Sequence, residues 1–266
     1  MSSQIKVVAT DMDGTFLNSL KDYDRPLFDQ LFKRMQEQQI KFIVASGNQY
    51  AQLRSFFLEK DDEIAFVSDN GSQIFEHGKL VSWSTLDTSV VQQILAYAFA
   101  LPSLKHVTLS GLKSAYILDS ASDFGKKNAH QYYYNLTEVP DFAKVDDQIG
   151  KLNLMVEDSQ KDLVTAEINQ RFPGAARAVT SGHSSIDIIV PHINKAIGIK
   201  YLMNAWQLDQ SSLIAFGDQN NDLEMLEYAG IGVAMANSSA QVLAVANEVT
   251  KTSDENGVLE FLAKLI

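Results

Sequence analysis

The 266-residue sequence contains no cysteine, which excludes disulfides, thiolate nucleophiles and cysteine-based metal sites. Its chemistry must therefore come from oxygen and nitrogen groups. Basic residues are also scarce, because 22 Lys and Arg stand against 33 Asp and Glu, and the formal net charge is -11. Such a surface repels polyanions, which argues against nucleic acid or an anionic membrane as a partner.

Long apolar runs are missing as well. The N-terminal stretch MSSQIKVVATDMDG has a short apolar run interrupted by acids, unlike a signal peptide, and no later segment reaches membrane-spanning length. We therefore expect a cytoplasmic protein without a membrane partner. With 45% hydrophobic and 21% charged residues, the composition is that of a folded globular chain. The sequence leaves the oligomeric state open.

Short β-rich runs alternate with helical patterns at both ends of the chain. The run IKVVAT at 5–10 is almost continuously apolar, which is typical of a central strand covered on both faces. Further strands are expected at 40–45, 64–68, 186–190, 213–216 and 231–234, with helices over 26–39, 50–58, 195–206 and 222–228. This alternation predicts an α/β fold with a Rossmann-like, doubly wound core on a parallel sheet.

The middle of the chain follows a different rhythm. From about residue 85 to 184, strands such as those expected at 105–109, 116–118 and 152–156 are separated by longer helices. We interpret residues 85–184 as an inserted α+β cap domain. The core is then split into two parts, residues 1–84 and residues 185–266.

The strongest local signal is DMDGT at 11–15, which directly follows the first expected strand. In open parallel sheets, ligands bind beyond the carboxyl ends of the strands, and residues two apart in an extended chain point to one side. Asp11 and Asp13 can therefore converge, and carboxylates about 4 Å apart repel by roughly 4 kcal/mol at an effective dielectric near 20. Such a pair needs a cation or a shared proton, and Mg²⁺ suits its oxygen ligands. A calcium-binding EF-hand does not fit, because Phe16 and Asp22 occupy its glycine and glutamate positions.

A second acidic cluster, GDQNND at 217–222, lies between an expected strand and an expected helix. Asn221 or Asp222 can partly cap that helix. Asp218 lies too far upstream for capping, which favours it as a metal ligand. Two strand ends thus offer carboxylates to one site.

Two further features suit an anion. The turn Ser46-Gly47-Asn48 precedes a helix, so its hydroxyl and free amides can receive an anion, although a bare turn has the same sequence. Lys195 lies in the first turn of an expected helix, where a cation opposes the helix dipole. That unfavourable position indicates a specific anionic partner for Lys195.

In order, the segments DMDGT, SGN, a helix-borne lysine and GDQNND resemble the four motifs of the haloacid dehalogenase (HAD) superfamily. The long insertion resembles the cap of its Cof-type sugar phosphatase branch, as do Asn70-Gly71 and the DENGV segment near the C-terminus. The motif lysine of this branch is usually followed by glycine, whereas Ala196 follows Lys195 here. Lys200, further along the helix, is the alternative lysine.

The resemblance implies Mg²⁺-dependent hydrolysis of small phosphomonoesters, such as sugar phosphates, through an aspartyl-phosphate. Asp11 is then the nucleophile, and Asp13 is the general acid and later the general base. The implied metal ligands are Asp11, the backbone carbonyl of Asp13 and Asp218, and Asp222 orients Lys195 or the metal shell. The implied phosphate contacts come from Ser46, Lys195 and Asn221.

Specificity would then reside in the cap, which excludes water and reads the leaving group. His183 is the first candidate there, and His130 and Tyr132–Tyr134 are others, although aromatic residues in small domains more often pack. Two other functions remain open. One is a phosphomutase of the same superfamily, and the other is a non-catalytic phosphate or magnesium sensor.

Overall fold

A computed structural model describes residues 5–180 and 184–266. The chain divides into two compact units. The first unit comprises the chain up to Gly47, together with Phe57–Val81 and Asn194–Ile266, and the second comprises Asn48–Phe56 and Ser82–Ile193. The domain boundaries expected at residues 84 and 185 stay a prediction.

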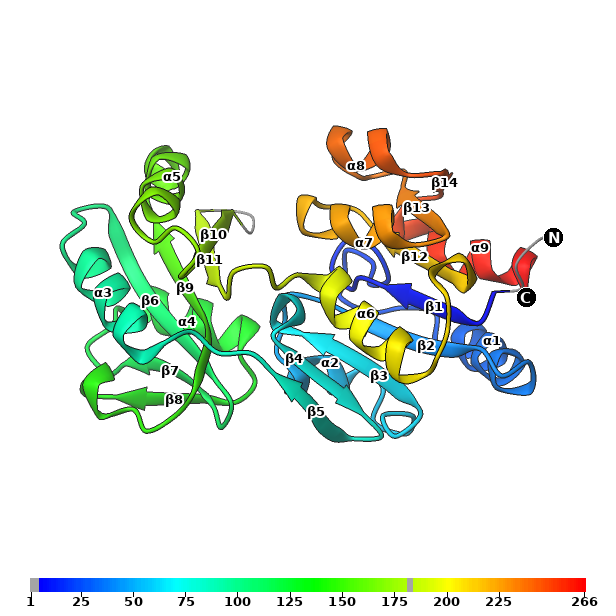
Figure 1. The fold of residues 1–266 in the computed structure, drawn as a ribbon, viewed down its shortest axis with the longest axis horizontal. Helices are drawn as coiled ribbons and strands as arrows, with labels where there is room; N and C mark the ends of the chain where they lie inside the picture. Colours follow the sequence, from blue (N-terminus) through cyan, green and yellow to red (C-terminus); the bar gives the residue numbers. More distant parts are fainter. Residues whose placement is uncertain (1–4, 181–183) are drawn as a thin grey trace. The chain divides into compact units, whose positions relative to one another are not determined.

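The first unit is built on a sheet that has eight strands among the described residues, in the order β14-β13-β12-β1-β2-β3-β4-β5 (Figure 1). These strands are β1 (Val7–Thr10), β2 (Lys41–Ala45), β3 (Ile64–Ser68), β4 (Gln73–Glu76), β5 (Lys79–Trp83), β12 (Leu213–Gly217), β13 (Ile231–Met235) and β14 (Glu248–Thr250). Neighbouring strands from β14 to β3 are parallel, and β4 runs antiparallel to β3. The strand order proceeds outward from β1 in both directions, which confirms the doubly wound α/β core.

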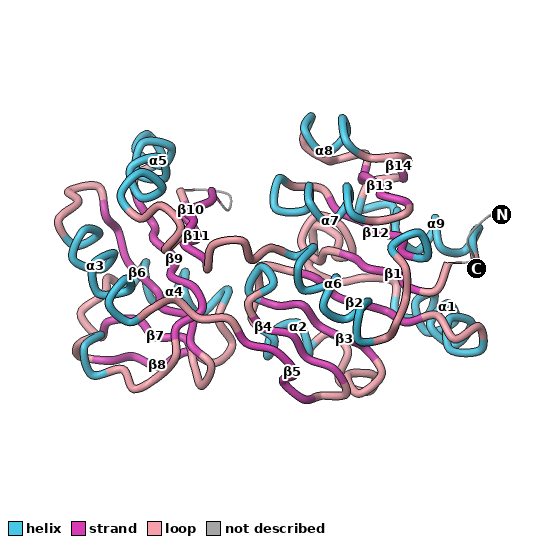
Figure 2. Tube along the Cα trace, in the orientation of Figure 1, coloured by secondary structure: helices cyan, strands magenta, loops and turns pink. Residues whose placement is uncertain are grey.

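The helices of this unit are α1 (Arg25–Glu37), α6 (Lys195–Ala205), α7 (Leu223–Tyr228), α8 (Ala240–Val245) and α9 (Gly257–Leu265). Short 3₁₀ turns are η1 (Asp69–Gly71), η4 (Gln210–Ser212), η5 (Asn220–Asp222) and η6 (Ser253–Glu255). The start of α1 follows from its sequence, since the Asp24 side chain accepts the Leu27 N–H and a proline occupies the first turn. Figure 2 shows how helices alternate with strands along this unit.

Residues of the sheet strands pack against two different sets of helices. Val7 and Ala9 of β1 belong to a buried cluster with residues of α6 and α7. On other strands, Phe28 of α1 lies 5.3 Å from Phe42 of β2 between ring centroids, and Phe216 of β12 lies 5.6 Å from Phe261 of α9. Helices therefore cover both faces of the sheet, which explains why the β1 sequence is apolar without alternation.

The second unit contains a six-stranded sheet, counted over the described residues, in the order β10-β11-β9-β6-β7-β8. Its strands are β6 (Leu104–Gly111), β7 (Ala115–Leu118), β8 (Leu136–Val139), β9 (Ile149–Val156), β10 (Arg177–Thr180) and β11 (Ser185–Ile189). All neighbours are antiparallel except β7 and β8. The helices of the unit are α2 (Tyr50–Ser55), α3 (Thr88–Phe99), α4 (Asp123–Tyr132) and α5 (Lys161–Arg171), with 3₁₀ turns η2 (Phe142–Lys144) and η3 (Asp158–Gln160). This mixture is an α+β arrangement, as predicted for the insertion.

One strand joins a different sheet from the one expected. The run at 186–190 was expected to resume the core, but β11 pairs with β9 and β10 in the six-stranded sheet, so this expectation is wrong. Ile186 and Ile188 are buried in the hydrophobic cluster of the second unit. A short apolar run is compatible with either sheet, because strand pairing depends on residues far away in the sequence.

In the part of the chain that the structure describes, no helix has both the length and the apolar character needed to cross a bilayer.

We expect Phe28→Ala to lower the free energy of unfolding by about 3–5 kcal/mol, because the substitution empties a well-packed aromatic cluster. The Phe28 ring is fully buried, with the rings of Phe16 and Phe57 at 5.4 and 5.5 Å. Equilibrium urea unfolding measures the change. Leu20→Ala is the control, because Leu20 is 85% exposed and its truncation should cost less than about 0.5 kcal/mol. Equal stability of the two variants would contradict this account of the core.

Candidate active site

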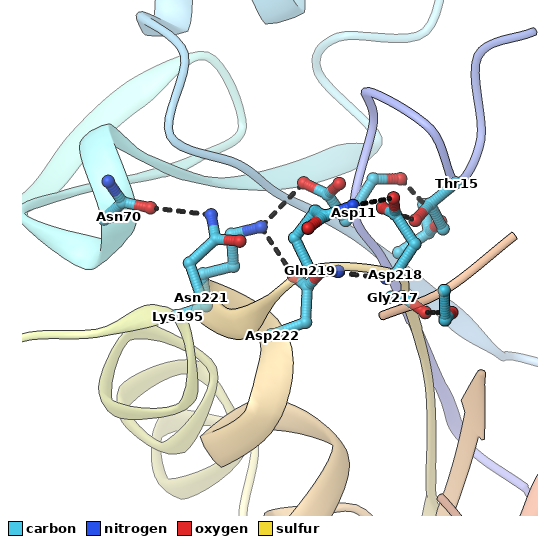
Figure 3. Close-up of polar contacts among 11 residues, drawn as sticks. Asp11, Thr15, Asn70, Lys195, Gly217, Asp218, Gln219, Asn221 and Asp222 are labelled. Carbon is cyan, nitrogen blue, oxygen red and sulfur yellow. Dashed lines mark hydrogen bonds and ion pairs between the residues drawn. The ribbon is translucent and has the colours of Figure 1, made fainter. Parts of the chain in front are cut away.

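The carboxyl ends of β1 and β12 bring the two acidic motifs together. Asp11 follows the last residue of β1, and its N–H donates to the Phe216 carbonyl at 3.0 Å. Asp218 follows the last residue of β12. Carboxylate oxygens of Asp11, Asp218 and Asp222 lie within 4.8 Å of one another, and all three residues are buried (Figure 3).

Lys195 provides the positive charge of this cluster. It is the first residue of α6, and Asn194 caps this helix by accepting the Ile197 N–H at 3.0 Å. The Lys195 side chain is only 1% exposed, and its Nζ lies 2.6 Å from both Asp11 Oδ1 and Asp222 Oδ1. Lys200 instead places its Nζ 4.6 Å from the centre of the Tyr228 ring. Of the two lysines considered from the sequence, Lys195 is the one in the cluster.

Asp222 connects the lysine to the loop that carries Asp218. Its Oδ2 accepts the backbone N–H groups of Asp218 at 2.9 Å and Gln219 at 3.0 Å, while its Oδ1 accepts from Lys195. The Gln219 side chain in turn caps η5, so the loop and the 3₁₀ turn form a capping box. Both oxygens of Asp222 are thus engaged in holding other members of the site.

The first motif also fixes Asp218. Gly14 has a positive φ of 79°, and a Cβ at this position would lie 2.6 Å from Asp218 Oδ2, so only glycine fits. The neighbouring Thr15 donates its Oγ1 hydrogen to Asp218 Oδ1 at 2.7 Å. Sequence reasoning did not assign a role to Thr15, and its place directly after the glycine of the motif was the available signal.

Charge in the cluster is unbalanced, because three buried carboxylates surround one ammonium. Burial raises the pKa of Asp11 well above its usual range, although Lys195 acts to lower it, and Asp222 and Asp218 raise it further. Burial also raises the pKa of Asp218, against the lowering effect of its hydrogen bond from Thr15. For Lys195, burial acts to lower the pKa, but Asp11 and Asp222 outweigh it and the pKa is raised. Lys195 therefore stays protonated, and an excess of negative charge is left for a further cation.

The residues present fit a hard divalent cation. Among the described residues, Asp11, Asp218 and Asp222 form the group whose ligand atoms are close enough to hold one metal ion. All of these atoms are carboxylate oxygens, which Mg²⁺ prefers. The Asp13 side chain lies outside this group, because its Oδ1 is 2.5 Å from Lys21 Nζ and the side chain is 38% exposed. A contribution from the Asp13 backbone carbonyl stays a prediction.

A third strand end contributes Asn70. Its backbone N–H donates to the Ser46 carbonyl at 3.0 Å. Its side-chain Oδ1 accepts from Asn221 Nδ2 at 3.2 Å (Figure 3). Ser46 itself is buried directly after β2. The first segment of the first unit ends at Gly47, and the segment that begins at Asn48 belongs to the second unit. The sequence marked Asn70 as part of a turn, and its contact with Asn221 was not foreseen.

The residues proposed from the sequence to contact substrate from the cap differ in their exposure. His183 lies outside the described residues, so its expected role stays a prediction. His130 is exposed near the end of α4. Tyr133 is buried in a small apolar cluster, whereas Tyr132 and Tyr134 are 43% and 63% exposed. Packing is therefore the structural role of Tyr133.

Comparison with known proteins agrees with this fold. The family of haloacid dehalogenase-like hydrolases matches residues 8–262. The 5-amino-6-(5-phospho-D-ribitylamino)uracil phosphatase YbjI of Escherichia coli is 36% identical over 262 residues, covering 98% of this chain and 96% of YbjI. The phosphatase YitU of Bacillus subtilis, which carries the same activity name, is 24% identical over 279 residues. That match covers 98% of this chain and 98% of YitU. The crystal structure of SMU.1108c from Streptococcus mutans has a TM-score of 0.93 at 33% identity, with 98% of each chain covered.

These matches define the protein class as a phosphatase that hydrolyses phosphoric monoesters. The chain belongs to the haloacid dehalogenase-like hydrolases, in their Cof-type branch. The family, the fold class and the enzyme class predicted from the sequence are thereby confirmed. The relatives named above give no support to a phosphomutase or a non-catalytic sensor.

We expect Asp218→Asn to stabilise the metal-free protein by about 1 kcal/mol at neutral pH. The folded protein raises the pKa of Asp218, so the wild type loses stability as the pH rises from the ordinary aspartate pKa through the raised value. Asparagine removes that loss. The gain should shrink as the pH falls from the raised pKa toward the ordinary aspartate pKa of about 4, because the wild-type carboxyl becomes protonated over this range. Urea unfolding in the presence of a chelator, at several pH values, measures this difference.

Asp62→Asn is the control for this experiment, because it makes the same charge change at an exposed position of the first unit. Its effect should stay within about 0.5 kcal/mol at every pH. If Asp218→Asn is less stable than the wild type at neutral pH, the account of unbalanced buried charge is wrong.

Proposed function

We propose that this phosphatase acts on small phosphorylated metabolites by a Mg²⁺-dependent route in which Asp11 becomes phosphorylated. The observation that supports this most is the 2.6 Å contact between Asp11 Oδ1 and Lys195 Nζ, beside the carboxylates of Asp218 and Asp222. A buried carboxylate next to an ammonium and a cation site is suited to receive a phosphoryl group. The position of Asp11 at a strand end leaves the adjoining loops to bind the substrate.

In the first step, an Asp11 oxygen forms a bond to phosphorus while the bond from phosphorus to the leaving oxygen breaks. Asp13 donates a proton to that leaving oxygen. In the second step, Asp13 accepts a proton from a water molecule whose oxygen attacks the phosphorus. The bond from phosphorus to Asp11 then breaks, so that inorganic phosphate leaves and the Asp11 carboxylate is restored.

The remaining residues stabilise the charge that spreads over the equatorial phosphoryl oxygens. Lys195 supplies a positive charge, and Asp222 keeps its ammonium in place. The donors are the Ser46 hydroxyl, the Asn221 side chain and the backbone amides of Gly47 and Asn48. When held by Asp11, Asp218 and the Asp13 backbone carbonyl, Mg²⁺ would neutralise negative charge on the phosphoryl group.

We expect Asp11→Asn to reduce the turnover of p-nitrophenyl phosphate by at least about 10³-fold, because the amide is a far weaker nucleophile. The fold should persist, since asparagine keeps the size of the side chain and one acceptor oxygen. Phosphate release in the presence of Mg²⁺ gives the rate, and a thermal unfolding scan checks the fold.

Wild-type protein with excess chelator should be equally inactive and should recover when Mg²⁺ is added. Substantial turnover by the variant would rule out Asp11 as the nucleophile, and substantial turnover with chelator would rule out the metal requirement.

The names of two relatives suggest a particular substrate. YbjI and YitU are named for 5-amino-6-(5-phospho-D-ribitylamino)uracil, a phosphorylated polyol joined to a pyrimidine, and each match spans 98% of this chain. We expect kcat/KM for this compound to exceed that for phosphoglycolate at least tenfold. Phosphate-release assays on both compounds measure the ratio. A ratio of one or less would exclude this compound as the preferred substrate, and the proposed phosphatase mechanism would still stand.

A further inference from the structure

The chain makes an unusual buried turn immediately after β3. Three successive residues, Asp69, Asn70 and Gly71, have positive φ values of 47°, 56° and 100°. Asparagine tolerates the left-handed region better than most residues, but a run that includes two non-glycine residues is uncommon. Asp69 and Asn70 are only 1% and 4% exposed, so this is not a relaxed surface turn. Buried backbone strain of this kind tends to occur at functional sites.

The contacts of Asn70 join the ends of three strands. Its backbone N–H donates to the carbonyl of Ser46, which follows β2, and its side-chain Oδ1 accepts from Asn221, which follows β12. Asn70 and Asn221 are 151 residues apart in sequence. The left-handed backbone of Asn70 is what allows one residue to use its main chain toward one loop and its side chain toward another.

Gly47 shows how closely the Asn70 side chain approaches the turn after β2. A Cβ on Gly47 would lie 3.2 Å from both Asn70 Nδ2 and Asn70 Oδ1, which is tighter than an ordinary contact. Glycine at position 47 therefore lets the Asn70 amide sit against the turn. The Asn70 side chain thus lies against this turn and also accepts a hydrogen bond from the amide of Asn221.

We propose that Asn70 is a positioning residue for phosphate binding, an inference that rests on the proposed function of this site. The Asn221 amide nitrogen carries two hydrogens, and Asn70 Oδ1 accepts one of them. That bond fixes the direction of the second hydrogen, which is left for a phosphoryl oxygen. The contacts of Asn70 with Ser46 and Gly47 hold the other donors at a constant distance from Asn221. Asn70 thus acts through its neighbours and forms no bond with the reacting atoms.

The variant that tests this role is Asn70→Gly, which accepts the same left-handed backbone and removes only the side-chain amide. We expect kcat/KM for p-nitrophenyl phosphate to fall at least tenfold, mostly through a higher KM, with a similar rise in the inhibition constant of inorganic phosphate. The thermal midpoint should stay within about 3 °C of the wild type. Asn256→Gly is the matched control, because Asn256 is also left-handed, with a φ of 55°, and lies in the same unit at the start of α9. Its kinetic constants should equal those of the wild type.

A double-mutant cycle separates positioning from general packing. If Asn70 acts by orienting Asn221, then Asn70→Gly combined with Asn221→Ala should be no worse than the more damaging single variant. Fully multiplicative losses, or wild-type KM in Asn70→Gly, would overturn the proposal.

Amide hydrogen exchange at Ser46, whose N–H donates to the Val67 carbonyl at 2.9 Å, reports on positioning of the turn without relying on turnover. Asn70→Gly should accelerate this exchange at least tenfold, and Asn256→Gly should leave it unchanged. An unchanged rate in Asn70→Gly would refute the positioning role. If the wild type itself fails to hydrolyse phosphomonoesters, the proposed function is wrong, and the exchange rate still decides whether Asn70 holds the turn.

Discussion

The ion pairs of Lys195 with Asp11 and Asp222 hold the site together. They are almost fully buried, and each spans 2.6 Å between the ammonium and a carboxylate oxygen. Removing one partner of a buried pair leaves an uncompensated charge, which is far more costly than the loss of a surface pair. Because one ammonium faces three carboxylates, the cluster keeps an excess of negative charge that suits a divalent cation. The excess of buried carboxylates thus destabilises the metal-free protein and at the same time favours binding of a divalent cation.

Local backbone geometry makes this arrangement possible. Asp222 accepts the amides of its own loop and the ammonium of Lys195, so that one side chain links the end of β12 to the start of α6. Gly14 leaves the space that Asp218 occupies, because any side chain there would meet the carboxylate. The parallel sheet supplies the rest, since its strands all end at the same edge and deliver their following residues to one place.

The fold was predictable from sequence where both faces of a strand are buried. The runs that form β1, β2, β3, β12 and β13 are apolar and bounded by turn residues, and their positions were predicted to within about two residues. The assignment of β11 to the core was wrong, because the sequence of a five-residue strand does not reveal its partner strand. The elements α8 and β14 were not foreseen, since they have six and three residues and carry little periodic signal.

The sequence by itself determined the chemistry available to this protein. Because the chain has no cysteine, any metal ligand must be an oxygen or nitrogen group. Two acidic motifs follow runs expected to form apolar strands, and a lysine lies in the first turn of a helix, where the helix dipole disfavours a cation. Only the tertiary structure decided that Lys195 bridges Asp11 and Asp222, that Thr15 holds Asp218, and that Asn70 meets Asn221. These contacts join segments up to 203 residues apart in the chain. Periodicity and turn signals describe neighbours along the chain, whereas contacts of this range exist only once the sheet has formed.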